Sequence, residues 1–270
     1  MATFSQRPLR PDSRVIALVR DVSPEIGRCE LSHLARAPID VGHAARQHGA
    51  YLEALRAAGC EVEHIPPAPE LPDGVFVEDT AVVLDEIAVI TRPGAASRRA
   101  ETASVAEALR RHRPIESIAA PAILDGGDVL VSGRTLFVGL TPRTSTQGAA
   151  ELARITVSAG YTVRTVPVTG CLHLKSAVTE VGDRTLLINP AWVDPLLFED
   201  YRLIPIDPLE PFGANALRIG DVVIYPAEFP RTGTRLRDEG VEVRHVEASE
   251  LAKAEGGVTC CALLLSPQRG

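Results

Sequence analysis

Two adjacent cysteines near the end of the chain, Cys260 and Cys261, could supply a nucleophile. They follow two glycines and precede an apolar run, so the sequence predicts a last strand over residues 256–265. Because side chains alternate between faces along a strand, we expect one thiol in the core and the other facing a cleft. Most free cysteines are simply buried, so a catalytic role requires a base, a carboxylate and a pocket from elsewhere in the chain.

Three carboxylates fall within seven residues, at Asp73, Glu78 and Asp79. Apolar residues lead into and away from Glu78 and Asp79, which predicts that both lie in a buried strand. A lone buried charge is costly, so these carboxylates need a cationic partner. A planar guanidinium suits them because it makes paired charge-assisted hydrogen bonds. Either a substrate or a structural arginine could supply it.

Two further segments could orient and ionise a thiol. Paired glycines at 126–127 separate Asp125 from Asp128. They predict either a tight turn with Asp128 in solvent or the presentation of Asp125 into a cleft. His173 lies in a predicted extended segment; a single histidine is more often structural, but it is the natural base for a thiol. Cys171 and His173 alone form only a weak zinc signal.

The elements that must position these residues recur along the chain. Hairpins of short β-rich runs are predicted to begin near residues 81, 129, 177 and 216. Helices are predicted over 97–112, 145–158 and 231–239, and an extended segment follows the connection in each unit. Parallel βαβ units have no hairpin before the helix, so the hairpins argue against a doubly wound sheet.

The two ends of the chain complete each other in this pattern. Residues 14–20 form a predicted strand, and a helix over 40–58 follows it, with Asp40 as N-cap and Gly59 at its end. This strand and helix lack a preceding partner, whereas the C-terminal strand lacks a helix after it. Joining them gives a further unit and closes a ring. We expect a single domain over residues 1–270, with residues 1–13 loosely ordered.

Composition limits the class of protein. The chain has 270 residues, is 45% hydrophobic and 23% charged, and carries a net charge of −7, as expected for a globular protein. The charge and the lack of a basic run argue against nucleic acid and membrane surfaces as partners. There is no signal-peptide pattern or membrane-length apolar run, and five cysteines show no disulfide framework. We expect a cytoplasmic monomer or homodimer.

These motifs, taken together, resemble those of the dimethylarginine dimethylaminohydrolases, and the resemblance runs from about residue 15 to the C-terminus. It implies an α/β fold: a five-bladed α/β-propeller of ββαβ units with pseudo-fivefold symmetry, as in the guanidino-group-modifying superfamily. The motifs that carry it are FVED at 76–79, RPGAASRR at 92–99, LDGGDVL at 124–130, LHLKS at 172–176 and GVTCC at 257–261.

Matched residue by residue, the resemblance implies a role for each site residue. Cys260 is expected to be the nucleophile, His173 the general acid and base, and Asp125 the group that orients His173. Glu78 and Asp79 are expected to hold the substrate guanidinium. The amino-acid end of the substrate is expected to contact Asp73, Arg98, Arg143 and the backbone carbonyls near Leu31 and Ala254.

The implied reaction is hydrolysis of Nω-methylated arginine to citrulline and methylamine or dimethylamine. A cationic guanidinium favours the thiolate of Cys260, which attacks the central carbon. His173 protonates the departing amine and then activates water to hydrolyse an S-alkylthiouronium intermediate. No metal or organic cofactor is implied, and Zn²⁺ bound between Cys260 and His173 would inhibit.

The alternatives are a deiminase-like hydrolase of another guanidine, a non-catalytic propeller that serves as a binding module, and a papain-like protease. Arginine deiminases and amidinotransferases place an acid two residues after the catalytic histidine, where this chain has Lys175. That difference favours a substituted guanidine. A binding module has no use for the combination of Cys260, His173 and Asp125. The protease requires a cysteine that precedes its histidine, which is the opposite order.

Overall fold

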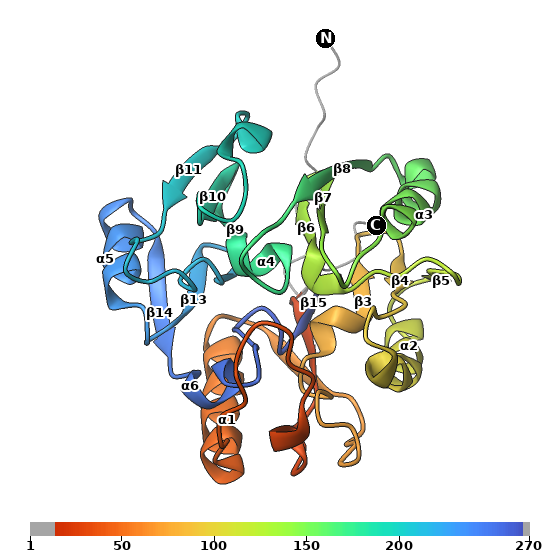
Figure 1. The fold of residues 1–270 in the computed structure, drawn as a ribbon, viewed down its shortest axis with the longest axis horizontal. Helices are drawn as coiled ribbons and strands as arrows, with labels where there is room; N and C mark the ends of the chain where they lie inside the picture. Colours follow the sequence, from red (N-terminus) through yellow and green to blue (C-terminus); the bar gives the residue numbers. More distant parts are fainter. Residues whose placement is uncertain (1–13, 267–270) are drawn as a thin grey trace.

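The computed structural model describes residues 14–266 as five three-stranded sheets arranged in a ring (Figure 1). In each sheet the middle strand pairs antiparallel with one neighbour and parallel with the other. The sheets are β15–β1–β2 (Leu263–Leu265, Ile16–Val19, Glu61–His64), β3–β4–β5 (Ala81–Val83, Ala88–Ile90, Ile115–Ser117), β6–β7–β8 (Val129–Ser132, Thr135–Leu140, Thr162–Pro167), β9–β10–β11 (Val178–Gly182, Thr185–Ile188, Arg202–Pro205) and β12–β13–β14 (Leu217–Ile219, Val222–Pro226, Glu242–Val246).

The two ends of the described chain meet in one sheet, as predicted. Strand β1 pairs antiparallel with β15, with Ile16 opposite Leu265, and parallel with β2, with Ile16 opposite Glu61. This sheet is the fifth ββαβ unit, so the α/β-propeller of five blades is confirmed. The expected loose order of residues 1–13 lies outside the described residues, and a single domain over the whole chain stays a prediction.

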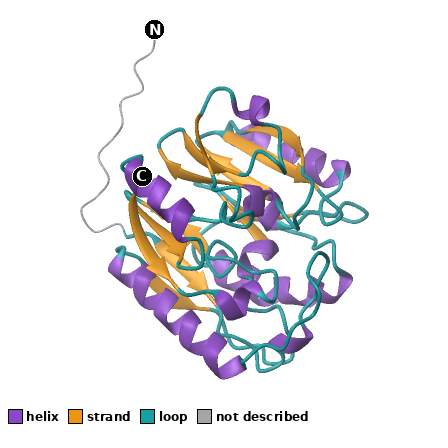
Figure 2. Cartoon of the chain, turned by 60° about the vertical axis from the view of Figure 1, so that its left-hand side comes forward, coloured by secondary structure: helices purple, strands orange, loops and turns teal. Residues whose placement is uncertain are grey.

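Four longer helices lie on the outside of the ring (Figure 1), and Figure 2 shows helices packed against the outer sides of the sheets. They are α1 (Val41–Ala57), α2 (Thr102–Arg110), α3 (Thr146–Thr156) and α5 (Pro230–Asp238). The Asp40 side chain accepts the His43 N–H at 2.8 Å, which confirms the predicted N-cap of α1. Gly59, with φ of +95°, follows the end of α1. Buried apolar residues such as Val105 and Leu109 of α2 pack against the sheets.

The remaining helical segments are short. They are α4 (Leu174–Ala177), α6 (Ser249–Ala252) and the 3₁₀ turns η1 (Ile26–Arg28), η2 (Val77–Thr80), η3 (Ala96–Glu101), η4 (Gly126–Asp128), η5 (Val157–Ala159) and η6 (Pro195–Phe198). The predicted helix over 97–112 is therefore divided into η3 and α2. A 3₁₀ turn places residues three apart on one side, and here it directs Arg98 and Glu101 together into the interior. Within residues 14–266, no helix is both long and apolar enough to span a bilayer.

The expectation of one strand over 256–265 is wrong in its first half. Strand β15 begins at Leu263, and residues 258–261 form a turn. Cys260 and Cys261 therefore differ in environment because of this turn, and strand alternation is not the reason. Cys261 is buried in an apolar cluster, whereas Cys260 is partly exposed and lines a pocket.

Candidate active site

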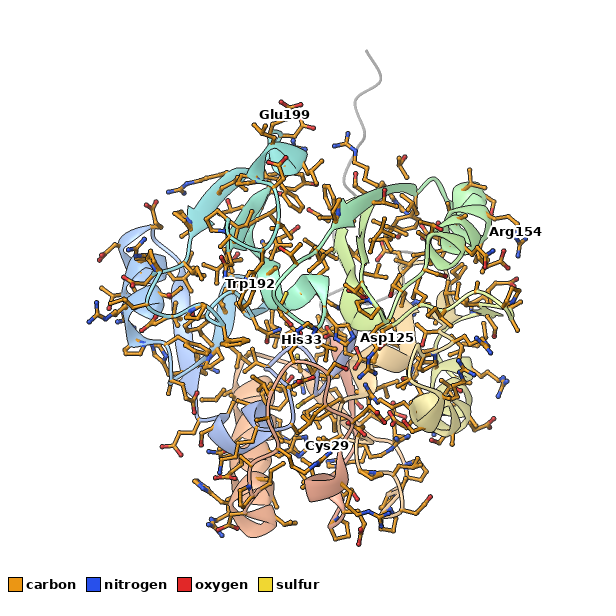
Figure 3. All side chains as sticks on the ribbon, in the orientation of Figure 1. Cys29, His33, Asp125, Arg154, Trp192 and Glu199 are labelled. Carbon is orange, nitrogen blue, oxygen red and sulfur yellow. The ribbon has the colours of Figure 1, made fainter. Side chains whose placement is uncertain are left out.

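Five of the candidate site residues occupy the same place in their units, namely the segment that leads into the first strand: Glu78, Asp79, Asp125, His173 and Cys260. Turn η2 leads into β3, η4 into β6, α4 into β9, and the turn with Cys260 into β15. These first strands contact one another around the centre of the ring. Figure 3 accordingly shows Asp125 near the centre, whereas Arg154 and Glu199 lie at the periphery. The repeat thus brings together residues that are far apart in the sequence.

One pocket at the centre collects seven of the ten predicted site residues: Asp73, Asp79, Arg98, Arg143, His173, Ala254 and Cys260. Asp125 lies behind His173, and Leu31 lies in a neighbouring loop. Glu78 instead lines a separate cavity between the first strands of the five sheets, together with Lys175 and Thr259. The predicted strand placement of Glu78 and Asp79 is wrong, since both lie on η2. Their predicted burial is confirmed.

His173 is bracketed by carboxylates. Its Nε2 lies 3.0 Å from Asp125 Oδ2, and its Nδ1 lies 3.6 Å from Asp79 Oδ1. Since Asp125 accepts the Nε2 proton, Nδ1 is the ring nitrogen that faces the pocket. Burial opposes the charged ring, but the carboxylates of Asp79, Asp125 and Asp128 outweigh it and raise the pKa of His173 to about 9. The imidazole is therefore charged at neutral pH and can donate a proton.

Each of the paired glycines is required by a close approach, Gly126 by the Glu78 carbonyl and Gly127 by the Asp79 and His173 side chains. A Cβ on Gly127 would lie 2.6 Å from both Asp79 Oδ1 and His173 Nδ1, and the Gly127 N–H donates to Asp79 at 3.0 Å. Asp128 is fully buried, whereas the tight-turn alternative expected it in solvent. It accepts hydrogen bonds from Thr141, Thr144 and Leu174 N, and so joins η4 to the segment of Arg143 and to α4.

Asp79 is held as a carboxylate by an arginine of the protein. Arg98 Nη1 pairs with Asp79 Oδ2, and the remaining guanidinium nitrogens of Arg98 contact Glu101 at 2.7 and 3.1 Å. Burial would raise the pKa of Asp79, but the charges of His173 and Arg98 lower it to about 2. Asp79 is therefore ionised at the pocket and can accept hydrogen bonds from a cation there.

Glu78 has a different environment from its neighbour. Lys175 Nζ lies 2.6 Å from Glu78 Oε1, and Thr259 Oγ1 donates to Oε2 at 2.8 Å. Burial raises the pKa of Glu78, an effect that Lys175 opposes. The Glu78 N–H also donates to Cys260 O at 3.1 Å, so η2 is joined directly to the turn that carries the thiol.

The thiol of Cys260 lies in a turn that several hydrogen bonds hold in place. Gly257 N–H donates to its Sγ at 3.2 Å, and Cys260 N–H returns to Gly257 O. The Asn215 amide holds the preceding Thr259 at both its N–H and its hydroxyl. Burial and the nearby carboxylates of Glu78 and Asp79 raise the pKa of Cys260 to about 12. In the free protein the thiol is therefore protonated at neutral pH.

This raised pKa predicts slow alkylation of Cys260 at neutral pH. The thiolate is the reactive form, and below a pKa of about 12 its fraction increases tenfold with each pH unit. We expect the rate of carbamidomethylation by iodoacetamide to increase about tenfold per pH unit between pH 7 and 10. Mass spectrometry of the labelled peptide measures this rate, with Cys260→Ser as the control for label on other thiols. A plateau already at pH 7 would contradict the prediction.

The far end of the pocket carries the residues predicted for the amino-acid part of a substrate. Asp73 accepts the Glu30 N–H at 3.0 Å, and Arg143 Nη2 donates to Ser32 Oγ at 2.8 Å. Both contacts join the pocket wall to the loop that contains Leu31. The predicted arginine pair and Asp73 thus line the same end, although Arg98 also reaches Asp79.

A carboxylate that the sequence did not reveal holds this loop. Glu255, a non-glycine residue with φ of +59°, accepts the N–H groups of Ser32, His33 and Leu34 at 2.6–3.1 Å. Three successive N–H groups that converge on one anion form a backbone nest. Leu31 directly precedes the three N–H donors, and Ala254 directly precedes Glu255. The nest therefore keeps both residues beside the pocket.

Glu101 and Asn215 were also missed. Each acts on a predicted residue through hydrogen bonds, and their partners are known only from tertiary structure. For Glu101, the i to i+3 spacing from Arg98 was the one available signal.

Within residues 14–266, a possible metal-binding group consists of Asp79, Asp125 and His173, whose ligand atoms lie within 4.8 Å of one another. Cys260 is not a member of this group.

For the methylated arginine that the resemblance implies as substrate, we expect Glu101→Gln to raise KM by about tenfold to a hundredfold, with a smaller change in kcat. The substitution removes a buried charge-assisted pair worth about 1.5–3 kcal/mol, so the Arg98 guanidinium is held less firmly, mainly by Asp79 and the Phe76 carbonyl. Glu107→Gln on the exposed side of α2 is the matched control. Steady-state kinetics of both variants test the prediction, and equal KM values would contradict it.

A five-bladed ring of ββαβ units, with a cysteine, a charged histidine and buried carboxylates at its centre, defines a protein of the guanidino-group-modifying superfamily. The chain belongs within it to the dimethylarginine dimethylaminohydrolase family. The family described as "N,N dimethylarginine dimethylhydrolase, eukaryotic" matches residues 36–194. The N(G),N(G)-dimethylarginine dimethylaminohydrolase of Streptomyces coelicolor is 42% identical, over 92% of this chain and 96% of that protein.

Solved structures agree with this assignment. A Pseudomonas aeruginosa dimethylarginine dimethylaminohydrolase, a cysteine-to-serine mutant in complex with citrulline, is 31% identical with a TM-score of 0.87. A histidine-to-glycine mutant of a dimethylarginine dimethylaminohydrolase, in an adduct with S-methyl-L-thiocitrulline, is 32% identical with a TM-score of 0.87. Each match covers 92% of this chain and 98% of the other.

Proposed function

We propose that this protein hydrolyses Nω-methylated arginine, both asymmetric dimethylarginine and monomethylarginine, to citrulline and dimethylamine or methylamine. The observation that carries the proposal is one pocket lined by Cys260, a charged His173 and an ionised Asp79. A cation can bind between the carboxylate and the thiol, and Arg98, Arg143 and Asp73 lie at the end suited to an α-amino acid. Family membership supports the same reaction.

In the proposed mechanism the substrate cation promotes its own reaction. The guanidinium lowers the cost of the Cys260 thiolate, so the thiol gives up its proton to solvent and the sulfur forms a bond to the guanidino carbon. His173, a charged imidazole, gives its Nδ1 proton to the substituted nitrogen as the carbon–nitrogen bond breaks. The neutral imidazole then removes a proton from water, which attacks the thiouronium carbon and releases citrulline and the thiol. Asp125 keeps the ring in the required orientation.

Lys175 supports a substituted guanidine as substrate. Its ammonium already pairs with Glu78, so this carboxylate is partly neutralised before any substrate binds. A dimethylated guanidine nitrogen has no N–H to donate, so it requires fewer acceptors than an unsubstituted one. We therefore assign Asp79 as the main acceptor for the guanidinium, with Glu78 contributing through its remaining negative charge.

Citrulline release from asymmetric dimethylarginine, monomethylarginine and arginine, measured in parallel, tests the proposal. We expect rapid release from both methylated substrates and little from arginine. Preference for arginine would make the protein a deiminase despite Lys175. No release from any of the three would contradict the proposed activity and favour another N-substituted guanidine or the non-catalytic binding module.

Several properties of the proposed enzyme follow from the same chemistry. The reaction needs no metal or organic cofactor, because the thiol and the imidazole supply every step. Zn²⁺ is proposed as an inhibitor that binds Cys260 and His173, and EDTA should reverse its effect. Five free thiols suit a reducing compartment, so we propose a cytoplasmic monomer or homodimer that does not use nucleic acid or membrane as a partner.

A further inference from the structure

A second cavity, of about 170 Å³, adjoins the charged pocket at the nucleophile. Cys260, Gly256, Leu172 and Glu255 line both spaces, so the thiol lies at their junction. The reacting carbon of a substrate must reach Cys260, and the amino-acid end is expected among the charges of the first pocket. The substituents on the guanidino group then point toward the second cavity.

The second cavity differs from the first in its chemistry. Its walls include Leu34, Leu172, Phe212, Phe229 and Ala252, and the charges of the arginines and aspartates of the first pocket are absent from its lining within the described residues. The edge of Phe212 packs against Trp192, with ring centroids 5.1 Å apart, which stiffens the outer rim.

Three of the polar side chains that line this cavity, Glu228, Glu255 and Asn215, are already engaged in hydrogen bonds, and His33 and Ser176 also line it. Glu228 accepts the Ala248 N–H at 2.9 Å, and Glu255 accepts the loop N–H groups of residues 32–34. The Asn215 amide is bound to Thr259 and to Lys175 O. An apolar ligand in the cavity would therefore leave the hydrogen bonds of these three groups in place.

The size of the cavity exceeds what methyl groups need. A cavity needs about 10–15 Å³ to hold one water molecule, so a cavity of about 170 Å³ has room for several waters. A methyl group is similar in size to one water, so two methyl groups would leave most of the cavity unfilled. An alkyl chain of several carbons would exclude more water and bury more apolar surface.

We propose that this cavity is the subsite for the Nω-substituent, and that the protein accepts arginines with apolar Nω-substituents larger than methyl. The inference rests on the proposed function and names its substrate class. For Nω-propylarginine, the Cys260 thiol gives up its proton to solvent, its sulfur bonds to the guanidino carbon, and the bond to the propyl-bearing nitrogen breaks. That nitrogen takes a proton from His173 and leaves as propylamine. Water then replaces sulfur, so that Nω-propylarginine and water give citrulline and propylamine.

The test compares Nω-propylarginine with Nω-methylarginine, using the full-length protein and measuring both citrulline and the released amine. We expect kcat/KM for the propyl substrate to lie within tenfold of that for the methyl substrate. A loss of more than a hundredfold, with the methyl substrate still turned over, would overturn the subsite while the proposed function stands. No turnover of either substrate would overturn both.

A substitution that fills the second cavity tests whether the Nω-substituent lies there. Ala252 is exposed at the end of α6 and lines the cavity, so a larger side chain there is accommodated without disturbing the core. Ala252→Phe is expected to lower the propyl-to-methyl ratio of kcat/KM at least tenfold. Ala50→Phe, on the exposed side of α1 and outside both spaces, is the matched control and should leave the ratio unchanged. An unchanged ratio in Ala252→Phe would overturn the proposal.

Discussion

Replacement of Cys260 by serine is expected to lower citrulline release from asymmetric dimethylarginine by about 10⁴-fold or more. A serine hydroxyl is far less acidic and less nucleophilic than a thiol, and loss of a covalent nucleophile has cost up to about 10⁶-fold in other hydrolases. The fold should be kept, because the Gly257 N–H that contacts Sγ can donate equally to a hydroxyl oxygen. Turnover and thermal unfolding of the purified variant measure both effects.

The neighbouring cysteine provides a matched control. Cys261 is 1% exposed and packs in the apolar cluster with Ala17 and Tyr51. Cys261→Ser places a hydroxyl there at a cost of about 1–3 kcal/mol of folding stability, without touching the pocket. We expect a lower melting temperature and turnover within about threefold of the parent protein. Activity that survives in Cys260→Ser but disappears in Cys261→Ser would move the nucleophile to the second position.

The parts of the fold that local signals encode could be predicted from the sequence. The β-rich runs, the cap at Asp40 and the glycine at 59 are short-range features, and they predicted the hairpins, α1 and the closure of the ring. Closure followed from the absence of a partner at each end of the chain. What local signals could not give is the break at Leu263, because Asn215 fixes the cysteine turn from 44 residues away.

In the candidate site, too, local sequence signals predict some features, whereas contacts between distant residues determine the others. Recurrence of the unit explains why Asp125 and His173, 48 residues apart, meet at the centre, so a periodic sequence could indicate this pair. The burial of Asp128 depends on donors from two later segments. The pairing of Arg98 with Asp79, rather than with a substrate carboxylate alone, likewise depends on the three-dimensional approach of η3 to η2. The types and order of the residues predicted the chemistry of the site, but their hydrogen-bond and ion-pair partners are set by the tertiary structure.

The position of the Arg98 guanidinium indicates how the pocket selects a substrate by its charges. In the described structure its guanidinium lies between Asp79 and Glu101, at the junction between the two ends of the pocket. A bound amino acid would bring one carboxylate to the arginines and one guanidinium to Asp79, which preserves the charge balance of this buried region. A ligand with only one of these groups would leave a buried charge without a partner, and such a charge is costly. We therefore expect discrimination against free alkylguanidines.

His173→Gly is expected to lose steady-state turnover of methylated arginine by about 10²–10⁴-fold, because an amine cannot leave unprotonated. The first bond-forming step need not be lost with it. With S-methyl-L-thiocitrulline, methanethiolate is a competent leaving group without a proton from the protein, so Cys260 can still form the thiouronium. Hydrolysis of this adduct requires a base, and the variant lacks the imidazole that Asp79 and Asp125 hold in place. Intact-mass spectrometry should detect the stalled species.

Two controls separate this role from a structural one. The double variant Cys260→Ser, His173→Gly should show no adduct, which locates the bond at the predicted sulfur. His64→Gly removes an exposed histidine at the end of β2 and should turn over normally. If His173→Gly turns over dimethylarginine at the parental rate, another group supplies the proton and His173 is not the acid. If it forms no adduct and yet folds normally, His173 is needed before the first bond forms, and the thiolate depends on the imidazolium as well as on the substrate cation.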